Sequence, residues 1–318
     1  MSDNNSRTPK IDILMATHNG EDYIAEQISS LQNQTFENWT LLISDDCSQD
    51  STMSIIEKMQ KEDPRIKVVS TGKKHGSAKA NFMNLLKFSK SEYAMFCDQD
   101  DFWMPTKIEK SLDGMINLEA EKGKKRPLLV YTDLRVVDKS LCTISDSFFS
   151  YAHRQVPLEL PYALVANSIP GCTMLFNSRA RDLASRIADP SQIIMHDWWL
   201  ALVTLVYGDA LMLTDATILY RQHGSNESGA DRFKLSKALR QYSFRASKEE
   251  WLLKFAQAQN VLAISENEPD ANRQSEIETF ANLLHMNRMS RMRFLAKNKI
   301  KPNRLWEKIY AYVICFVL

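Results

Sequence analysis

The chain of 318 residues is long enough for one large domain or two modest ones. Its 44% hydrophobic and 25% charged residues are ordinary for a globular protein, and no apolar run reaches the roughly 18 residues that a membrane span needs. The five cysteines form no CxxC pair, which argues against a disulfide framework or a zinc site and favours a reducing compartment. The first ten residues show no secretory pattern, so we expect a cytoplasmic protein.

The net charge of +1 conceals an asymmetry along the chain. Residues 231–318 carry 16 Lys and Arg against 9 Asp and Glu, whereas the first 230 residues carry 24 against 30. We therefore expect the acidic part to hold a metal and the basic part to face an anionic surface.

After a lead-in over residues 1–9 that we expect to be disordered, apolar runs over 11–16, 39–44, 66–70 and 93–97 predict four buried strands. Helical spacing of apolar residues between them completes a β-α-β-α-β-α-β order, which predicts a parallel sheet covered by helices. Right-handed crossovers bring the carboxyl ends of such strands to one edge. Three of these ends carry polar clusters: Thr17-His18-Asn19, Asp45-Asp46 and Asp98-Gln99-Asp100-Asp101.

The third cluster places three carboxylates within four residues. Like charges this close repel, and a buried carboxylate without a partner is costly. A hard cation such as Mg²⁺ or Mn²⁺ relieves both problems and also attracts phosphates. A solvated acidic turn that opens a helix after Pro105 is the alternative. The absence of GxGxxG and GxxxxGK[ST] from this region argues against the common dinucleotide and P-loop sites.

Beyond Pro105 the pattern is less regular. It predicts a helix over 106–121, a strand over 128–137, a flexible segment over 140–169, a strand ending at 177, a helix that begins near 196, a strand over 210–220, and helices from about 231 onward. Asp197 either caps its helix or, beside two tryptophans, has its pKa raised toward that of a general base. His223, at a strand end, is either a ligand of a metal or diphosphate or a structural histidine. His196 is interpreted as a packing neighbour.

Segments 15–20, 34–36, 44–48 and 98–101 together resemble the family 2 glycosyltransferases. Segments 170–174, 196–199 and 221–224 are similar to the bacterial rhamnosyltransferase-like branch of that family. The resemblance covers residues 11 to about 225. It implies the GT-A fold and inverting transfer of a sugar, usually L-rhamnose from dTDP-L-rhamnose, to a glycan or lipid-linked acceptor in surface polysaccharide synthesis. A UDP-hexose donor and a non-catalytic sugar- or lipid-binding module on the same fold are the alternatives.

The resemblance also implies roles for single residues. His18 departs from the tyrosine usual at its position, and Cys47 from the small residue usual at its own. Trp198 and Trp199, which directly follow Asp197, are expected on the acceptor side. The implied nucleotide-binding residues are Thr17, Asn19, Asp46 and Asp98. Mn²⁺ or Mg²⁺ would be held by Asp98 and Asp100, with Asp101 and His223 as further candidate ligands. The catalytic base would be Asp197.

We expect a GT-A domain over residues 10–228, with a nucleotide-binding half over 10–104 and an acceptor-binding half over 105–228, and a helical region over 229–318. Between residues 288 and 308 the helical region carries eight Lys and Arg against one acid, Glu307. A basic helix beside an apolar segment suits an anionic membrane, so we expect peripheral contact with the inner face of the cell membrane. A helix packed on the catalytic domain and a homodimer interface are the alternatives. Nucleic acid is not expected, because no stacking platform accompanies the charges.

Overall fold

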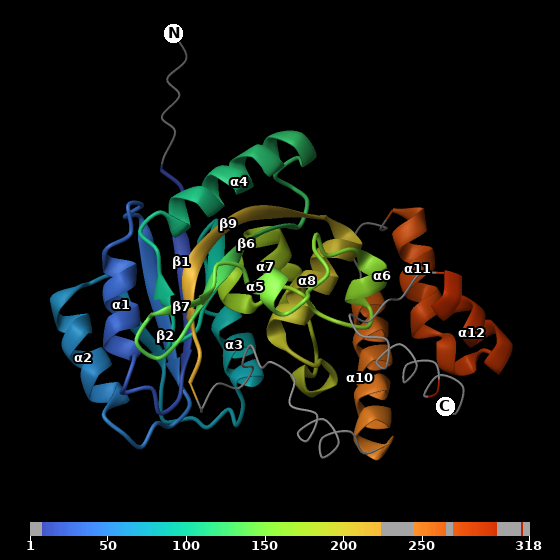
Figure 1. The fold of residues 1–318 in the computed structure, drawn as a ribbon, viewed down its shortest axis with the longest axis horizontal. Coiled ribbons are helices and arrows are strands. Elements are labelled where there is room, and N and C mark those ends of the chain that lie inside the picture. Colours follow the sequence, from blue (N-terminus) through green and yellow to red (C-terminus); the bar gives the residue numbers. More distant parts are fainter. Residues whose placement is uncertain (1–7, 224–243, 265–269, 298–312, 314–318) are drawn as a thin grey trace, which may run out of the picture.

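The computed structural model describes residues 8–223, 244–264, 270–297 and 313. A nine-stranded sheet runs in the order β3-β2-β1-β4-β8-β6-β9-β5, with β7 paired to β6. Helices flank the sheet, and α10, α11 and α12 lie at the end remote from α1 and α2 (Figure 1). The expected α/β class with a helical C-terminal region is confirmed.

The first half of the sheet is parallel, as the sequence predicts. Strands β1 (Ile11–Thr17), β2 (Trp39–Asp45), β3 (Ile66–Ser70) and β4 (Tyr93–Cys97) pair in parallel, joined by helices α1 (Ile24–Gln32), α2 (Thr52–Glu62) and α3 (Ala78–Leu86). Strand β4 is buried along its whole length, as expected for a strand covered on both faces. Helix α3 begins after Ser77, whose hydroxyl accepts the Ala80 N–H at 3.2 Å.

The second half makes the sheet mixed. Strand β8 (Met174–Asn177) runs antiparallel to both β4 and β6 (Leu128–Val137), while β9 (Asp209–Arg221) is parallel to β6. Helix α4 (Lys107–Lys122) covers this part of the sheet (Figure 1). Outside the segment 140–169, the sequence analysis did not predict β5 (Phe102–Trp103), which pairs with the end of β9, or α7 (Ser178–Ala184).

The expectation of a flexible segment over 140–169 is wrong. This stretch contains β7 (Thr143–Ser145), α5 (Phe148–Tyr151) and α6 (Leu160–Ala163). It is anchored on β6, since the Asp133 carboxylate accepts the Phe148 N–H at 3.1 Å and the Tyr131 hydroxyl accepts the Leu158 N–H at 2.9 Å. Several of its apolar side chains, such as Phe148, Phe149 and Leu160, are buried without following a helical or strand period, so pattern reading could not find them.

The C-terminal helices pack on α8 (His196–Tyr207). The Tyr207 hydroxyl bonds the carbonyls of Val261 and Ile264 at 2.8 and 3.0 Å, and the ring of Phe280 packs between those of Phe255 and Phe294.

None of the helices in the described ranges combines the length and apolar composition that a membrane span requires. Most of the predicted basic tail, from residue 298 on, lies outside the described residues, as do residues 1–7 of the lead-in. The described elements of the C-terminal region are α10 (Phe244–Ala263), α11 (Ala271–Ala281), the 3₁₀ turn η3 (Leu283–His285) and α12 (Arg288–Lys297). Two further 3₁₀ turns, η1 (Gly171–Thr173) and η2 (Pro190–Gln192), lie earlier in the chain.

Candidate functional site

A cleft of about 660 Å³ opens at the carboxyl edge of the parallel strands. All three polar clusters that follow β1, β2 and β4 contribute to its wall, as the crossover argument predicts. The 167–171 segment and the first turn of α8 also line the cleft. Of the predicted site residues, the cleft brings together Thr17, Asp46, Asp98, Asp100, Asp197 and Trp198.

The wall after β1 is built by a hydrogen-bond network. The Thr17 hydroxyl donates to Asp45 Oδ1 at 2.9 Å, and the Ser48 hydroxyl donates to the same oxygen at 2.6 Å. The Asn19 side-chain oxygen accepts the Gln49 N–H at 2.8 Å, so this amide fixes the loop after β2 and does not line the cleft. Thr17 and Asn19 therefore shape the wall, and in this structure their side chains already have protein partners.

The two departures from the family pattern are accommodated locally. The Nδ1–H of His18 donates to the Asp46 carbonyl at 3.0 Å, which ties the first cluster to the second. Cys47 has φ of 61°, the left-handed region in which glycine is favoured, and this explains why a small residue is usual there.

The Gln99 amide bonds both the N–H and the C=O of His18 at 3.0 Å. A Cβ at Gly20 would lie 2.4 Å from the Gln99 oxygen, so this close approach needs a glycine.

Asp46 is 7% exposed, and its carboxylate accepts the N–H groups of His75 and Gly76, the latter at 2.9 Å. Because a carboxylate has about four acceptor positions, about two remain for a ligand in the cleft. Lys74, in the same loop, also lines the cleft.

The acidic cluster after β4 divides between the cleft and the interior. The Oδ2 atom of Asp100 lies 2.8 Å from His223 Nε2, so two predicted metal ligands meet. Asp101 is fully buried and accepts the backbone N–H of Arg221 at 3.2 Å. Burial, followed by the charges of Asp100 and Asp98, raises the pKa of Asp101 well above its usual range. Ligand atoms of Asp98, Asp101 and Cys172 lie within 4.8 Å of one another.

Lys107 lies close enough to Asp101 to interact with its charge, and no sequence signal distinguishes it from other lysines at the start of a helix. Its side chain is fully buried, with the ammonium 4.5 Å from the centre of the Trp103 ring and no hydrogen-bond partner among the described residues. Burial lowers its pKa to about 8, an effect that the charge of Asp101 opposes. A cation in this position offsets part of the negative charge of the acidic cluster.

Asp197 lies in the first turn of α8 and lines the cleft. Met195 occupies the N-cap position, so the simple capping role is not the one that the structure shows. The Asp197 carboxylate accepts the Trp198 N–H at 2.6 Å and a backbone hydrogen bond from Gly171. Burial raises the pKa of Asp197 to about 6, and these hydrogen bonds limit the rise.

His196 packs beside the candidate base, as the sequence reading indicated. Its ring stacks on Phe82 with centroids 4.0 Å apart, and burial lowers its pKa to about 3, so it is neutral. A Cβ at Gly171 would lie 2.9 Å from His196 Nε2 and 3.3 Å from Asp197 Cβ. The turn η1 can therefore approach α8 only with glycine at position 171.

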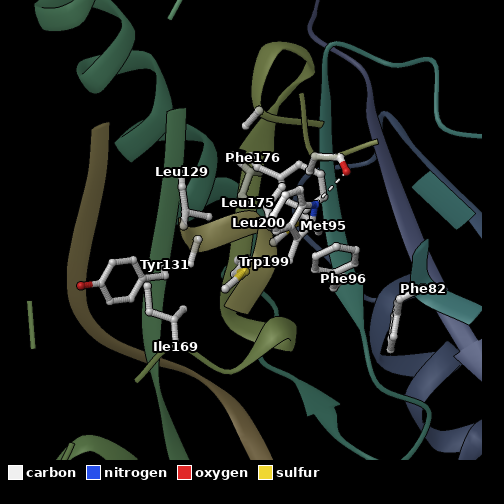
Figure 2. Close-up of a cluster of buried hydrophobic side chains, with 14 of the residues drawn as sticks. Phe82, Met95, Phe96, Leu129, Tyr131, Ile169, Leu175, Phe176, Trp199 and Leu200 are labelled. Atoms are coloured by element: carbon white, nitrogen blue, oxygen red, sulfur yellow. Dashed lines mark hydrogen bonds between the residues drawn. The ribbon is translucent and has the colours of Figure 1, made fainter. Parts of the chain in front are cut away.

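The two tryptophans after Asp197 lie on different faces of α8, because successive helical residues are about 100° apart. Trp198 lines the cleft and donates from Nε1 to the Ala163 carbonyl at 2.5 Å. Trp199 is fully buried among residues of β4 and β8, and its Nε1 donates to the Ala184 carbonyl at 2.8 Å (Figure 2). The expectation that Trp199 contacts the acceptor is therefore corrected: it supports α8 from the core.

A mixed sheet of this order, with acids at the ends of its parallel strands, is the arrangement expected of the GT-A fold. The family model "Glycosyl transferase family 2" matches residues 12–121. A dTDP-rhamnosyl transferase, RfbG, of Shigella flexneri is 30% identical over 230 residues, which are 68% of this chain and 74% of the relative. The chain belongs to glycosyl transferase family 2, and it is a glycosyltransferase.

Two further similarities bear on the site. A UDP-Glc:alpha-D-GlcNAc-diphosphoundecaprenol beta-1,3-glucosyltransferase, WfgD, of Escherichia coli is 34% identical over 106 residues, 33% of this chain and 41% of the relative. The mannosyltransferase PcManGT from Pyrobaculum calidifontis, solved with GDP-Man and Mn²⁺, superimposes with a TM-score of 0.53 at 15% identity, covering 98% of this chain and 87% of that one. The second similarity confirms the fold.

Proposed function

We propose that this glycosyltransferase moves a sugar with inversion from a nucleotide donor to a glycan or lipid-linked saccharide acceptor in bacterial surface polysaccharide synthesis. The observation that carries the proposal is that Asp197, with its raised pKa, lines the same cleft as Asp98 and Asp100. L-rhamnose from dTDP-L-rhamnose is the donor that we favour, because the Shigella relative with that activity matches over most of its length. A UDP-glucose donor is the second candidate, supported by the shorter match to the E. coli enzyme.

Asp197 would act as the general base. A carboxylate with a pKa of about 6 is mostly ionised at neutral pH and is still basic enough to accept the proton of an acceptor hydroxyl. The sugar carbon gains oxocarbenium character as the bond to the diphosphate breaks. Among the described residues that line the cleft, the other carboxylates, Asp46, Asp98 and Asp100, follow the strands β2 and β4, where we place the donor and the metal. We therefore infer direct attack by the acceptor, which inverts the anomeric centre.

We infer that Asp98, Asp100 and His223 hold Mn²⁺ or Mg²⁺, with Asp101 beneath them. Carboxylates with an imidazole suit these ions, and Asp100 and His223 are already in contact. When bound, the ion would neutralise charge on the leaving diphosphate. Asp101 has an unpartnered carboxylate oxygen among the described residues, which fits a neighbouring cation. The Mn²⁺ in the mannosyltransferase of the same fold is consistent with this assignment.

Thermal denaturation with a panel of donors would test the proposal. We expect dTDP-L-rhamnose with Mn²⁺ to raise the Tm more than UDP-glucose, UDP-galactose or UDP-GlcNAc, because only a ligand of the folded state stabilises by mass action. Without an acceptor, dTDP should be released from the same donor only slowly, by hydrolysis. An added acceptor should accelerate the release. A donor that raises the Tm but is never turned over would instead support the non-catalytic sugar-binding module.

Asp46→Ala should weaken binding of dTDP or UDP roughly tenfold, because the imide N–H of the base loses its acceptor and an unmade buried hydrogen bond costs about 1–3 kcal/mol. Isothermal titration would measure the dissociation constant. Asp12→Ala is the matched control: this buried carboxylate likewise accepts loop N–H groups, from Lys90 and Ser91 at 2.8 and 2.9 Å, but does not line the cleft. Equal affinity in the wild type and in Asp46→Ala would remove Asp46 from the nucleotide site.

We further propose peripheral contact of the C-terminal region with an anionic membrane. In the described part of this region, Arg288 and Arg293 of α12 are exposed and Met289 is 65% exposed beside them. Phe294 and Leu295 of the same helix are buried, which fixes the exposed face outward. Each Lys or Arg near an anionic surface contributes about 1 kcal/mol.

Flotation of the full-length protein with vesicles containing phosphatidylglycerol should show binding at low salt and release at high salt. Arg288→Gln/Arg293→Gln should float less, by about an order of magnitude in partition coefficient, because two such contacts are lost. Lys58→Gln/Lys61→Gln on the remote helix α2 is the control and should float normally. A protein that ignores these vesicles but forms a tight dimer would show that the region is an oligomer interface.

A further inference from the structure

Arg221, the last residue of β9, bonds three separate segments around the acidic cluster. Its Nε donates to the Asp100 carbonyl at 2.9 Å and one terminal nitrogen donates to the Lys139 carbonyl at 2.6 Å. The other terminal nitrogen pairs with Glu26 on α1. Its backbone N–H donates to the Asp101 carboxylate at 3.2 Å. The residue is 2% exposed, so these bonds form in a nearly dry environment.

The same strand end supplies His223. Its ring lies 2.8 Å from the Asp100 carboxylate and 4.8 Å from the ring of Tyr23, which also contacts the Arg221 guanidinium at 4.6 Å. Asp100 is therefore held from two directions: Arg221 binds its main-chain carbonyl, and His223 binds its side chain. Strand β9 fixes both, because it also pairs with β5, which follows the acidic cluster directly.

Only arginine can make this set of contacts. Its guanidinium is planar and offers donors in three directions, so Nε and the two terminal nitrogens can serve three acceptors on three segments at once. A lysine at this position would offer one nitrogen and could not bond both the Asp100 and the Lys139 carbonyls in these directions. A neutral side chain would leave Glu26 without its partner and the carbonyls unsatisfied.

We propose that Arg221 is a positioning residue, which fixes the turn at 100–101 so that Asp100 and His223 present their ligand atoms together to a divalent cation. This inference rests on the proposed metal role of those two residues. Preorganised ligands bind more tightly because less freedom is lost on binding, and groups that orient metal ligands commonly contribute 10–100-fold, by order of magnitude, to metal affinity. Arg221 itself binds no substrate or metal atom in this scheme.

The test is the dissociation constant for Mn²⁺ of the full chain without donor, measured by electron paramagnetic resonance of the free ion. Arg221→Lys and Arg221→Met should both raise it by about tenfold or more. In the presence of donor and acceptor, the Mn²⁺ concentration for half-maximal rate should rise in parallel, while kcat at saturating Mn²⁺ should recover to within a few-fold of wild type. Glu26→Gln, a change at the half-exposed end of the same network, should raise the constant in the same direction without preventing folding.

Arg181 provides the matched control. It is also a buried arginine with side-chain bonds to the Ser91 carbonyl at 2.5 Å and the Ser89 hydroxyl at 3.3 Å, but it lies on α7 and these bonds do not hold the turn at 100–101. Arg181→Lys should lower the Tm and leave Mn²⁺ affinity unchanged. Arg221 variants that lose Tm in the same way but bind Mn²⁺ like wild type would overturn the positioning role alone. Absence of Mn²⁺ and Mg²⁺ binding in the wild type would overturn the metal assignment and this inference with it.

Discussion

Asp197→Asn is expected to reduce turnover by about 10²-fold or more, the usual contribution of a positioned general base. The asparagine keeps the size of the side chain and can still accept the Trp198 N–H, but it cannot take a proton from the acceptor hydroxyl. Donor affinity should be nearly unchanged, since Asp197 faces the acceptor side of the cleft. Initial rates of nucleotide release with saturating donor and acceptor, together with donor titration, would measure the two effects separately.

The pH dependence gives a second readout of the same residue. Because burial raises the pKa of Asp197 to about 6, kcat/KM should fall below about pH 6 as the base becomes protonated. The effect on stability has the opposite sign to that of a salt-bridged carboxylate. The folded protein binds this proton more tightly than the unfolded chain, so ionisation of Asp197 lowers the free energy of unfolding as the pH rises from about 4 to 6. Asp197→Asn should therefore be at least as stable as wild type at pH 7.

Asp189→Asn is the control for this substitution. That aspartate bonds a backbone N–H of the following turn, that of Ser191 at 2.8 Å, as Asp197 does with Trp198, but it lies outside the cleft. Its turnover and pH profile should match those of wild type. Normal turnover in Asp197→Asn would mean that another residue is the base.

That the polar residues at the strand ends lie together in one site could be predicted from the sequence, because it follows from the topology of the sheet. Parallel strands joined by helices must end at one edge, so Asp46 and Asp98 could be placed together without coordinates. Ser77 could likewise be predicted as a cap, since a hydroxyl before a helix satisfies an N–H whatever packs around it.

The features that sequence reading missed depend on tertiary packing. Trp198 and Trp199 are adjacent and chemically identical, and only the direction in which α8 packs decides that one lines the cleft and the other fills the core. Lys107 looks like a surface residue until α4 covers the sheet and buries it. Arg221 acts through main-chain carbonyls, which carry no side-chain signal, so its partners could not be inferred from residue types.

Removing the Asp100 carboxylate should have the other large effect. Asp100→Ala is expected to abolish measurable transfer, with a loss of at least about 10²-fold, because the diphosphate loses part of the site that holds its counter-charge and His223 loses its 2.8 Å partner. Asp100→Asn should be almost as inactive, since the amide retains the size of the side chain but not its charge. Nucleotide release with Mn²⁺, with Mg²⁺ and with EDTA would be measured for each variant.

The control for Asp100 is Asp138→Ala, which removes a carboxylate that bonds the N–H groups of Ser140 and Cys142 at 2.8 and 2.9 Å outside the cleft. It should retain wild-type turnover and metal dependence. High Mn²⁺ should not rescue Asp100→Ala, because the defect is a missing ligand and not a misplaced one; this separates it from the Arg221 variants, which saturating Mn²⁺ should rescue. If the wild-type enzyme works equally well in EDTA and in Mn²⁺, the acidic cluster has no metal role, and Asp100 would then act only by orienting the donor through His223.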